Sequence, residues 1–353
     1  MFDPIVFKKE IESLKKIGFD ISDNLFISKK AHLILPTHRL LDAASEQQKG
    51  ETKIGSTLKG IGPTYKDKIG REGLRVGDLL HHFEEKYKAR IESHKLMLKE
   101  FFKYDYEKIL EECEKEWFEG VEVLKSFGIV DSEHMINQLL QEGKSVLAEG
   151  AQGTMLDIDF GSYPFVTSSN TICAGACTGL GVAPSKIGNV YGIMKAYCTR
   201  VGMGPFPTEL FDETGSKLRE AGHEYGSTTG RPRRCGWLDL VALKYSAMLN
   251  GVTELIMMKA DVLDQFETIN ICVGYEIDGE VVEHFPYELT GDVKPIYVEL
   301  PGWQTDLTKI KHQNEFPEEL NNYITFIEEE MGIPVTIASV GPNREQTILL
   351  DKD

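Results

Sequence analysis

Long hydrophobic runs, a targeting leader and a cysteine framework are all missing from this chain. No stretch approaches the ~20 consecutive apolar residues that cross a bilayer as a helix. Residues 1–10 lack the basic-then-apolar layout of a secretory signal peptide. The six cysteines show no disulfide or zinc spacing, and Cys173 and Cys177 have neither a Cys-x-x-Cys pattern nor a histidine partner. We therefore expect free thiols in a reducing compartment, with the cytoplasm as the location.

Positive charge is scarce as well. Lys and Arg number 39 against 56 Asp and Glu, which gives a formal net charge of −17. Nucleic acids and anionic membranes are bound through clustered Lys and Arg, so neither partner is expected. The length of 353 residues, with 41% apolar and 27% charged residues, is typical of a globular protein with a large core.

One segment concentrates positive charge against this acidic background. The stretch Gly226-Ser-Thr-Thr-Gly-Arg-Pro-Arg-Arg-Cys-Gly-Trp237 places Arg231, Arg233 and Arg234 beside two threonines. Guanidinium groups recognise carboxylates and phosphates in a bidentate manner, and a positive island in a negative field attracts small anions. The segment therefore predicts an anion site. The alternative is a solvated turn whose charges pair with nearby acids.

Hydrophobic patterning predicts an α/β protein with a mostly parallel central sheet. Short apolar runs, each followed by a loop with Gly, Thr or Asp, are typical of buried parallel strands with functional loops at their carboxyl ends. Such runs occur at residues 145–149, 190–197, 254–259 and 334–338. Residues 237–249 predict a helix that ends at Asn250-Gly251.

Other stretches predict additions around this sheet. Residues 28–50 have a helical pattern with a break at Pro36. Residues 78–127 are rich in Glu and Lys, with apolar residues at helical spacing, which predicts a helical insertion of two amphipathic helices. Residues 267–300 alternate in polarity and carry the turn sequence Ile277-Asp-Gly-Glu280, so we expect a small β segment there.

Several loops carry groups suited to nucleotide binding. Ser56-Thr-Leu-Lys-Gly-Ile-Gly62 has the hydroxyls, lysine and glycines of a phosphate cradle, although a flexible polar turn has the same composition. The amide of Gln152 could bind a purine edge, and the hydroxyl of Thr167 a phosphate. In Lys259-Ala-Asp261 the carboxylate can accept from guanine N1–H and its amine, while the lysine stem lies against the base. Each motif has a structural alternative when taken alone.

Together these motifs resemble the adenylosuccinate synthetase family. Residues 226–237 look like the aspartate-binding loop of that family, and the resemblance runs from about residue 25 to the end of the chain. Other matching segments are Gly60-Ile-Gly-Pro-Thr-Tyr65, Gly73-Leu-Arg-Val-Gly-Asp78, Glu149-Gly-Ala-Gln-Gly153, Val166-Thr-Ser-Ser-Asn170 and Lys259-Ala-Asp261. The resemblance implies the P-loop-like α/β fold of the family, with residues 1–353 as a single domain.

The resemblance also implies a reaction. The family condenses IMP with L-aspartate, using GTP as co-substrate and Mg²⁺, in the first committed step from IMP to AMP. O6 of IMP attacks the γ-phosphate of GTP to give 6-phosphoryl-IMP, and the α-amine of aspartate then displaces phosphate at C6. A homodimer is implied too, because the arginine that matches Arg71 reaches the IMP of the neighbouring subunit.

Binding residues follow from the resemblance, position by position. IMP is expected to contact Thr57, Arg71, Gln152, Thr167 and Arg231. Aspartate is expected to contact Thr228, Thr229, Arg231 and Arg233. GTP is expected to contact Arg233, Lys259, Asp261, Ser339 and Gly341. Leu58 stands where many relatives have glycine, so the backbone of the phosphate cradle can differ there.

The chain departs from the family pattern at its beginning. It contains neither a Gly-Asp-Glu-Gly-Lys-Gly-Lys phosphate loop nor an Asn-Ala-Gly-His segment. We therefore expect an N-terminally truncated domain in which the catalytic aspartate, the catalytic histidine and most Mg²⁺ ligands are absent, and an activity that is impaired. One alternative is a non-catalytic nucleotide-binding or dimerising remnant of the family. Another is an unrelated ATP-dependent ligase. Such an enzyme would need an adenine pocket, and Lys259-Ala-Asp261 indicates a guanine site instead.

Overall fold

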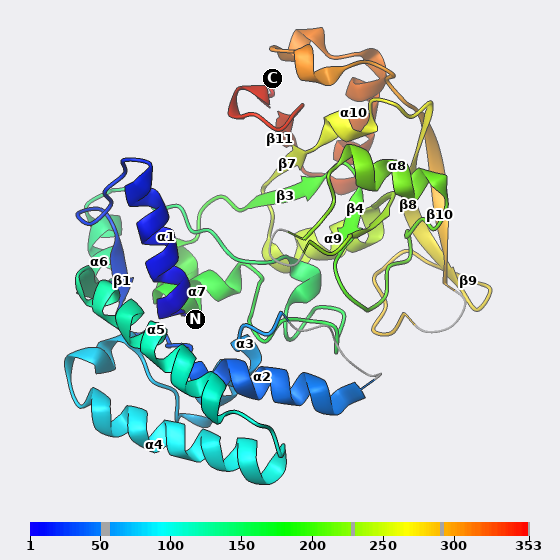
Figure 1. Ribbon diagram of the computed structural model, residues 1–353. Coiled ribbons are helices and arrows are strands. Elements are labelled where there is room, and N and C mark those ends of the chain that lie inside the picture. Colours follow the sequence, from blue (N-terminus) through cyan, green and yellow to red (C-terminus); the bar gives the residue numbers. More distant parts are fainter. Residues whose placement is uncertain (51–56, 227–229, 290–292, 352–353) are drawn as a thin grey trace.

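The computed structural model describes residues 1–50, 57–226, 230–289 and 293–351 (Figure 1). Helices from the first part of the chain gather on one side, and the strands of the second part gather on the other. All six cysteines are free thiols, as the spacing predicted. Within the described ranges, no helix has the length and apolar character needed to cross a membrane.

The helical side is built around a hydrophobic core of its own. Its main helices are α1 (Pro4–Lys16), α2 (Pro36–Lys49), α3 (Ile61–Gly70), α4 (Phe83–Leu96) and α5 (Glu107–Lys125). Trp117 of α5 lies in this core, where it is 1% exposed. Its indole N–H donates to the carbonyl of Ile34 at 2.7 Å. The rings of Tyr87 and Trp117 stack at 5.2 Å. The helix expected around Pro36 begins at that proline, and helices α4 and α5 occupy the stretch rich in Glu and Lys.

Helix α1 was not predicted from the hydrophobic pattern. Asp3 caps its first turn by accepting from the N–H of Ile5 at 3.0 Å, and Pro4 supplies a fixed φ at the first helical position. Gly120 lets α5 approach the start of α1 closely, because a Cβ at this position would lie 2.3 Å from the carbonyl oxygen of Pro4. Two short parallel strands, β1 (Phe26–Ser28) and β2 (Gly128–Val130), connect this side to α6 (Ser132–Gln141).

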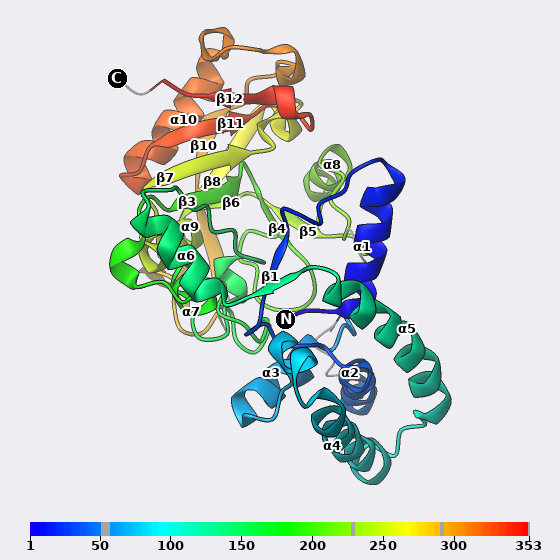
Figure 2. The same cartoon turned by 90° about the vertical axis from the view of Figure 1, so that its left-hand side faces the viewer.

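A four-stranded sheet forms the centre of the other side, in the order β12–β11–β7–β3 (Figure 2). The strands are β3 (Tyr191–Lys195), β7 (Glu254–Met258), β11 (Val335–Ser339) and β12 (Thr347–Leu349). Strands β3, β7 and β11 pair in parallel and β12 is antiparallel. The mostly parallel α/β sheet and three of its predicted strands are therefore confirmed.

The predicted strand at residues 145–149 is wrong. This stretch has no regular secondary structure and is exposed, and the side chain of Leu147 is 85% exposed. A strand needs a neighbour that supplies backbone hydrogen bonds. Among the described strands, β3 pairs only with β7, so it ends the sheet at this edge.

A second sheet joins β6 (Leu238–Asp239), β8 (Thr268–Ile277), β9 (Glu280–Val282) and β10 (Val293–Pro301). Strands β8 and β9 form the hairpin expected at residues 277–280, with Ile277 opposite Glu280. Both turn residues have positive φ, 52° at Asp278 and 86° at Gly279, which suits an Asp-Gly turn. The remaining strands are β4 (Cys198–Arg200) and β5 (Arg234–Gly236), which pair antiparallel.

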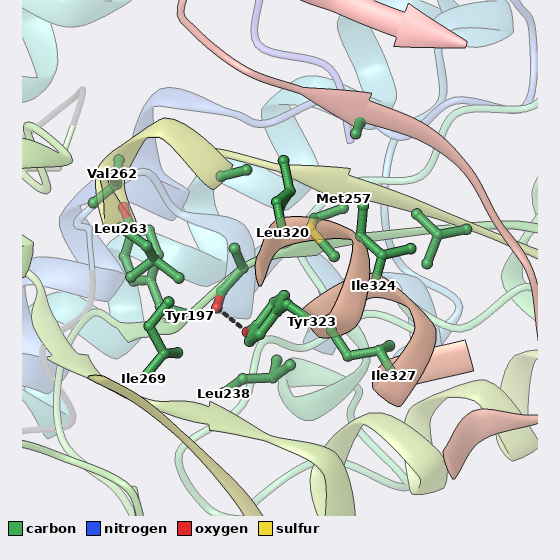
Figure 3. Close-up of a cluster of buried hydrophobic side chains, with 14 of the residues drawn as sticks. Tyr197, Leu238, Met257, Val262, Leu263, Ile269, Leu320, Tyr323, Ile324 and Ile327 are labelled. Atoms are coloured by element: carbon green, nitrogen blue, oxygen red, sulfur yellow. Dashed lines mark hydrogen bonds between the residues drawn. The ribbon is translucent and has the colours of Figure 1, made fainter. Parts of the chain in front are cut away.

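Helix α10 (Glu318–Met331) packs on the central sheet and completes the larger core (Figure 3). Leu320, Ile324 and Ile327 of this helix share the core with Met257 of β7. The buried hydroxyl of Tyr323 donates to the carbonyl of Ala196 at 2.6 Å, so the polar end of this side chain is satisfied.

Helix α9 (Leu240–Asn250) ends at Gly251, whose φ of 62° closes it as predicted. The side chain of Asn250 joins this helix to the irregular segment before the sheet. It donates to Thr154 Oγ1 at 2.9 Å and accepts from the N–H of Cys173 at 2.7 Å. Two further helices are α7 (Ala174–Leu180) and α8 (Glu213–Ala221).

Candidate active site

The arginine-rich loop is the tip of a hairpin that follows α8. At its neck, the N–H of Arg233 donates to the carbonyl of Glu224 at 2.8 Å. Further along, the N–H of Gly226 donates to the carbonyl of Arg231, also at 2.8 Å. Thr228 and Thr229 lie outside the described residues. Arg231 and Arg233 both lie on the arm of the hairpin that leads into β5, on either side of Pro232.

The three arginines of this hairpin have different environments. The guanidinium of Arg234 binds Glu209 Oε2 and the carbonyl of Gly204, each at 2.8 Å. For Arg234, therefore, the alternative of a charge that pairs with a nearby acid is the correct one. Arg233 is half-buried and its NH1 donates to Glu224 Oε2 at 2.6 Å. The side chain of Arg231 is exposed to solvent. Arg233 and Arg234 are thus both paired with carboxylates, whereas Arg231 lies at the surface of the hairpin.

Glu224 is a fully buried carboxylate that accepts from several cations. Its Oε1 accepts from Lys195 Nζ at 2.8 Å, Lys259 Nζ at 3.0 Å and the Tyr197 hydroxyl at 2.5 Å. Burial alone would raise the pKa of Glu224, but the hydrogen bonds from Lys195, Tyr197 and Lys259 outweigh it and bring that pKa to about 2. Glu224 is therefore ionised at neutral pH.

Lys259 and Asp261 follow the carboxyl end of β7, Lys259 as the N-cap of the 3₁₀ turn η6 (Ala260–Leu263) and Asp261 within that turn. Lys259 has a φ of 61°, and its ammonium also donates to the carbonyl of Gly222 at 2.5 Å. Burial raises the pKa of Asp261. Strand β11 runs parallel beside β7, so Ser339 and Gly341 follow at the same edge of the sheet. The structure thus brings the proposed guanine residues together.

The phosphate cradle leads directly into helix α3. Gly60 has a φ of 76°, and its N–H donates to Asp42 Oδ2 at 2.9 Å. Thr57 is exposed just before it, whereas residues 51–56 lie outside the described part of the chain. A Cβ on Gly62 would lie 3.6 Å from Ser168 Oγ, so the N-terminus of α3 meets the loop that carries Thr167.

Gln152 and Arg71 are more isolated. Gln152 is exposed and has a φ of 64° between its glycine-rich neighbours. Arg71 is exposed and closes the C-terminal end of α3, with a φ of 65°. Helix α3 separates it from the cradle at the other end.

A buried cluster, His38, Asp67 and His94, lies behind the cradle. His38 Nε2 is 2.9 Å and His94 Nε2 3.1 Å from the same oxygen, Asp67 Oδ2. His38 Nδ1 accepts from the N–H of Leu35 at 2.9 Å, which leaves the proton on Nε2. Thr64 Oγ1 lies 3.0 Å from His38 Nδ1 and donates to the carbonyl of Gly60. Sequence reasoning missed this cluster and Glu224, because single polar residues give no sign of burial.

Comparison with known proteins identifies the family. A sequence model described as adenylosuccinate synthetase matches residues 1–348. An adenylosuccinate synthetase of Bacteroides fragilis is 66% identical over 99% of this chain and 82% of its own length. The enzyme of Phocaeicola vulgatus is 65% identical over the same shares. The chain belongs to the adenylosuccinate synthetase family.

Solved structures agree with this assignment. Adenylosuccinate synthetase from Plasmodium falciparum superimposes with a TM-score of 0.86 and 37% identity, over 98% of this chain and 82% of that one. A cyanophage S-2L succinoaminodeoxyadenylate synthetase shares the fold, with a TM-score of 0.56 and 18% identity. As a member of the adenylosuccinate synthetase family, the chain is a GTP-dependent ligase of AMP biosynthesis.

The expectation of a missing N-terminal segment of the family domain is not supported, because the adenylosuccinate synthetase model matches the chain from residue 1. The impaired activity that we inferred from it is not supported either, nor is the placement of the Mg²⁺ ligands in such a segment. A non-catalytic remnant is not favoured.

The adenylosuccinate synthetase family uses Mg²⁺. Among the described residues, His38, Asp67 and His94 are the group whose ligand atoms lie within 4.8 Å of one another. Mg²⁺ takes oxygen ligands, whereas this group offers two imidazole nitrogens, and His38 Nε2 carries a proton. The His38–Asp67–His94 cluster therefore does not fit Mg²⁺.

Proposed function

We propose that this chain joins IMP and L-aspartate at the expense of GTP to form adenylosuccinate, through 6-phosphoryl-IMP, in the first committed step of AMP biosynthesis from IMP. The observation that carries the proposal is the contact of Glu224 with Arg233 on one oxygen and Lys259 on the other. Arg233 belongs to the proposed aspartate loop and Lys259 to the proposed guanine site. The two ligands would therefore meet at this carboxylate.

The arginine hairpin supplies the aspartate site in this proposal. Arg231 and Arg233 neutralise the aspartate carboxylates, with Thr228 and Thr229 as further donors, and leave the α-amine to attack C6 of the purine. Guanidinium groups suit this role because they offer several N–H donors in a rigid plane. Arg231 also contacts IMP, and Arg233 also contacts GTP.

The nucleotides occupy the loops on either side of this hairpin. Asp261 accepts from guanine, Lys259 lies against the base, and Ser339 and Gly341 line the same sheet edge. Thr57 and Thr167 bind the IMP phosphate near the N-terminus of α3, and Gln152 binds the purine edge. The meeting of Gly62 with Ser168 supports a shared phosphate site.

Arg71 completes the IMP site of a neighbouring subunit, so the active protein is a homodimer. The exposed position of Arg71 at the far end of α3 supports this arrangement. The cytoplasm remains the expected location.

The purified full chain tests the proposal directly. Incubation with IMP, GTP, L-aspartate and Mg²⁺ should produce adenylosuccinate, identified by chromatography and mass spectrometry, and omission of any substrate should abolish it. Replacement of GTP by ATP should lower kcat/KM roughly tenfold or more, because adenine lacks the donor pair that Asp261 would accept. Absence of adenylosuccinate from a chain shown to be folded by circular dichroism would contradict the proposal.

A further inference from the structure

The environment of Glu224 is unusual for a buried acid, because positive charge exceeds negative charge around it. Lys195, Arg233 and Lys259 all contact its carboxylate, and their side chains remain 26%, 27% and 34% exposed. One carboxylate cannot neutralise three cations. In a chain with a formal charge of −17, such a local excess is suited to an anionic ligand.

The geometry also constrains where these cations point. The side chain of Arg233 is fixed by Glu224 Oε2, and its backbone N–H is fixed by the Glu224 carbonyl at 2.8 Å. Lys259 is held by Glu224 Oε1 and by the carbonyl of Gly222, two residues earlier on the same arm of the hairpin. The bond from Arg233 uses NH1, and a guanidinium has further N–H donors for a ligand.

We propose that Glu224 is a positioning residue that orients Arg233 and Lys259 together, so that one buried carboxylate sets the affinity for both L-aspartate and GTP. This inference rests on the proposed function and deepens it. Glu224 touches neither substrate. Lys195 and Tyr197 hold the carboxylate in place from the side of β3 and β4, and Lys195 Nζ is fixed in turn by Thr199 Oγ1 at 2.8 Å.

The test is Glu224→Gln, which keeps the shape of the side chain and removes its charge. The apparent KM for GTP and for L-aspartate should both rise roughly tenfold, while the KM for IMP changes less than about twofold. Loss of structure alone would lower kcat for all substrates without this selective pattern. If the KM values for GTP and aspartate are unchanged, or if only one rises, the inference is overturned.

Glu209→Gln is the matched control. Glu209 also pairs with an arginine of this hairpin, Arg234, and its side chain is 11% exposed. This variant should leave both KM values unaltered. Equal effects of the two variants would show that any lost ion pair disturbs the hairpin, and would overturn the specific role of Glu224.

Two further measurements separate the inference from the proposed function. Calorimetric binding of GDP needs no turnover, and Glu224→Gln should weaken it roughly tenfold even if the wild type forms no adenylosuccinate. If Glu224→Gln does not fold, Tyr197→Phe removes one donor to the same oxygen and should raise both KM values about threefold. Unchanged GDP affinity in the first variant, or unchanged KM values in the second, would overturn the inference.

Discussion

His38 donates through Nε2 to Asp67 Oδ2 at 2.9 Å, and this bond joins the first turn of α2 to the middle of α3. The side chain of His38 is fully buried, and Asp67 is almost so. His94 lies 3.1 Å from the same oxygen. Because α3 begins at the cradle and ends at Arg71, the carboxylate of Asp67 fixes the helix that carries both.

We expect Asp67→Asn to lower the free energy of unfolding by about 3 kcal/mol, because the buried imidazole of His38 loses a charged acceptor and the nearby imidazole of His94 loses the charge that faces it. Urea denaturation at neutral pH measures this change. The exposed control Asp105→Asn should stay within about 0.5 kcal/mol of the wild type. Equal stability of the two variants would contradict the importance of this contact.

Stability should fall as pH decreases from 6.5 towards 4, in part because of His32. Burial, with Arg75 and Lys68 nearby, lowers the pKa of His32 from 6.5 to about 4, although Asp78 acts in the opposite direction. Between these values the unfolded chain binds a proton that the folded chain does not, so acid favours unfolding. The contribution of this group is about 3 kcal/mol at most.

Replacement of His32 by Asn should flatten the pH dependence of unfolding over that range. Burial also lowers the pKa of His38, so part of the pH dependence remains in both proteins. Urea titrations at successive pH values compare the slopes, with the exposed His284→Asn as the control. Parallel curves for the wild type and His32→Asn would refute the assignment.

Two glycine substitutions should have opposite effects on stability. Gly120→Ala should destabilise the chain by about 2 kcal/mol, because the new Cβ would meet the backbone of Pro4 and push α1 from α5. Gly179→Ala lies in α7 with open space around it and should stabilise by about 0.5–1 kcal/mol. Thermal denaturation compares them, and a stabilised Gly120→Ala would mean that the two helices do not pack this closely.

Asp261→Asn should change the preferred base of the nucleotide. An amide can donate to the 2-carbonyl of xanthine, which replaces the amine of guanine, whereas a carboxylate cannot. We expect the ratio of kcat/KM for GTP to that for XTP to fall at least tenfold. Asp264→Asn is the control, since Asp264 accepts from Trp303 at 2.9 Å and should affect stability without affecting this ratio. An unchanged ratio in Asp261→Asn would remove this residue from the guanine site.

Arg71 offers a test of the dimer by complementation. Arg71→Ala and Arg231→Ala should each abolish most activity when assayed alone. The two variants are mixed in equal amounts, unfolded and refolded together so that subunits pair at random. If Arg71 acts across the interface, activity should return to about a quarter of the wild type, because about half of the dimers are mixed and one of the two sites in each mixed dimer is intact. Absence of recovery in mixed dimers, verified by mass spectrometry, would place Arg71 in the site of its own subunit.

The sequence predicted the central strands because buried parallel strands are continuous apolar runs, as at residues 254–258 and 335–339. Residues 145–149 have the same character but form no strand, since an apolar run does not reveal whether a neighbour is available. The contact of His38 with Asp67 spans 29 positions along the chain, and no local periodicity signals it.

In the candidate site, the sequence indicated the residues that face a ligand but not the residue that holds them in place. Motifs identify the groups that face a ligand, such as Arg231 and Lys259, because ligand chemistry restricts their residue types. The residue that holds them is less restricted. Glu224 lies in a polar stretch, His223-Glu-Tyr-Gly226, and only the folded arrangement shows that four side chains donate to it.

The junction at Asn250 has a consequence for the chemical ageing of the protein. Asparagine followed by glycine is the sequence at which side-chain amides are lost most readily, because the glycine nitrogen is unhindered. Hydrolysis to aspartate would remove the amide that donates to Thr154 Oγ1 and to the carbonyl of Ser246. The hydroxyl of Thr154 can turn to donate to a carboxylate, but the carbonyl of Ser246 would then face an acceptor in place of a donor. Stored preparations would thus become mixtures in which the last turn of α9 carries an additional negative charge in only part of the molecules.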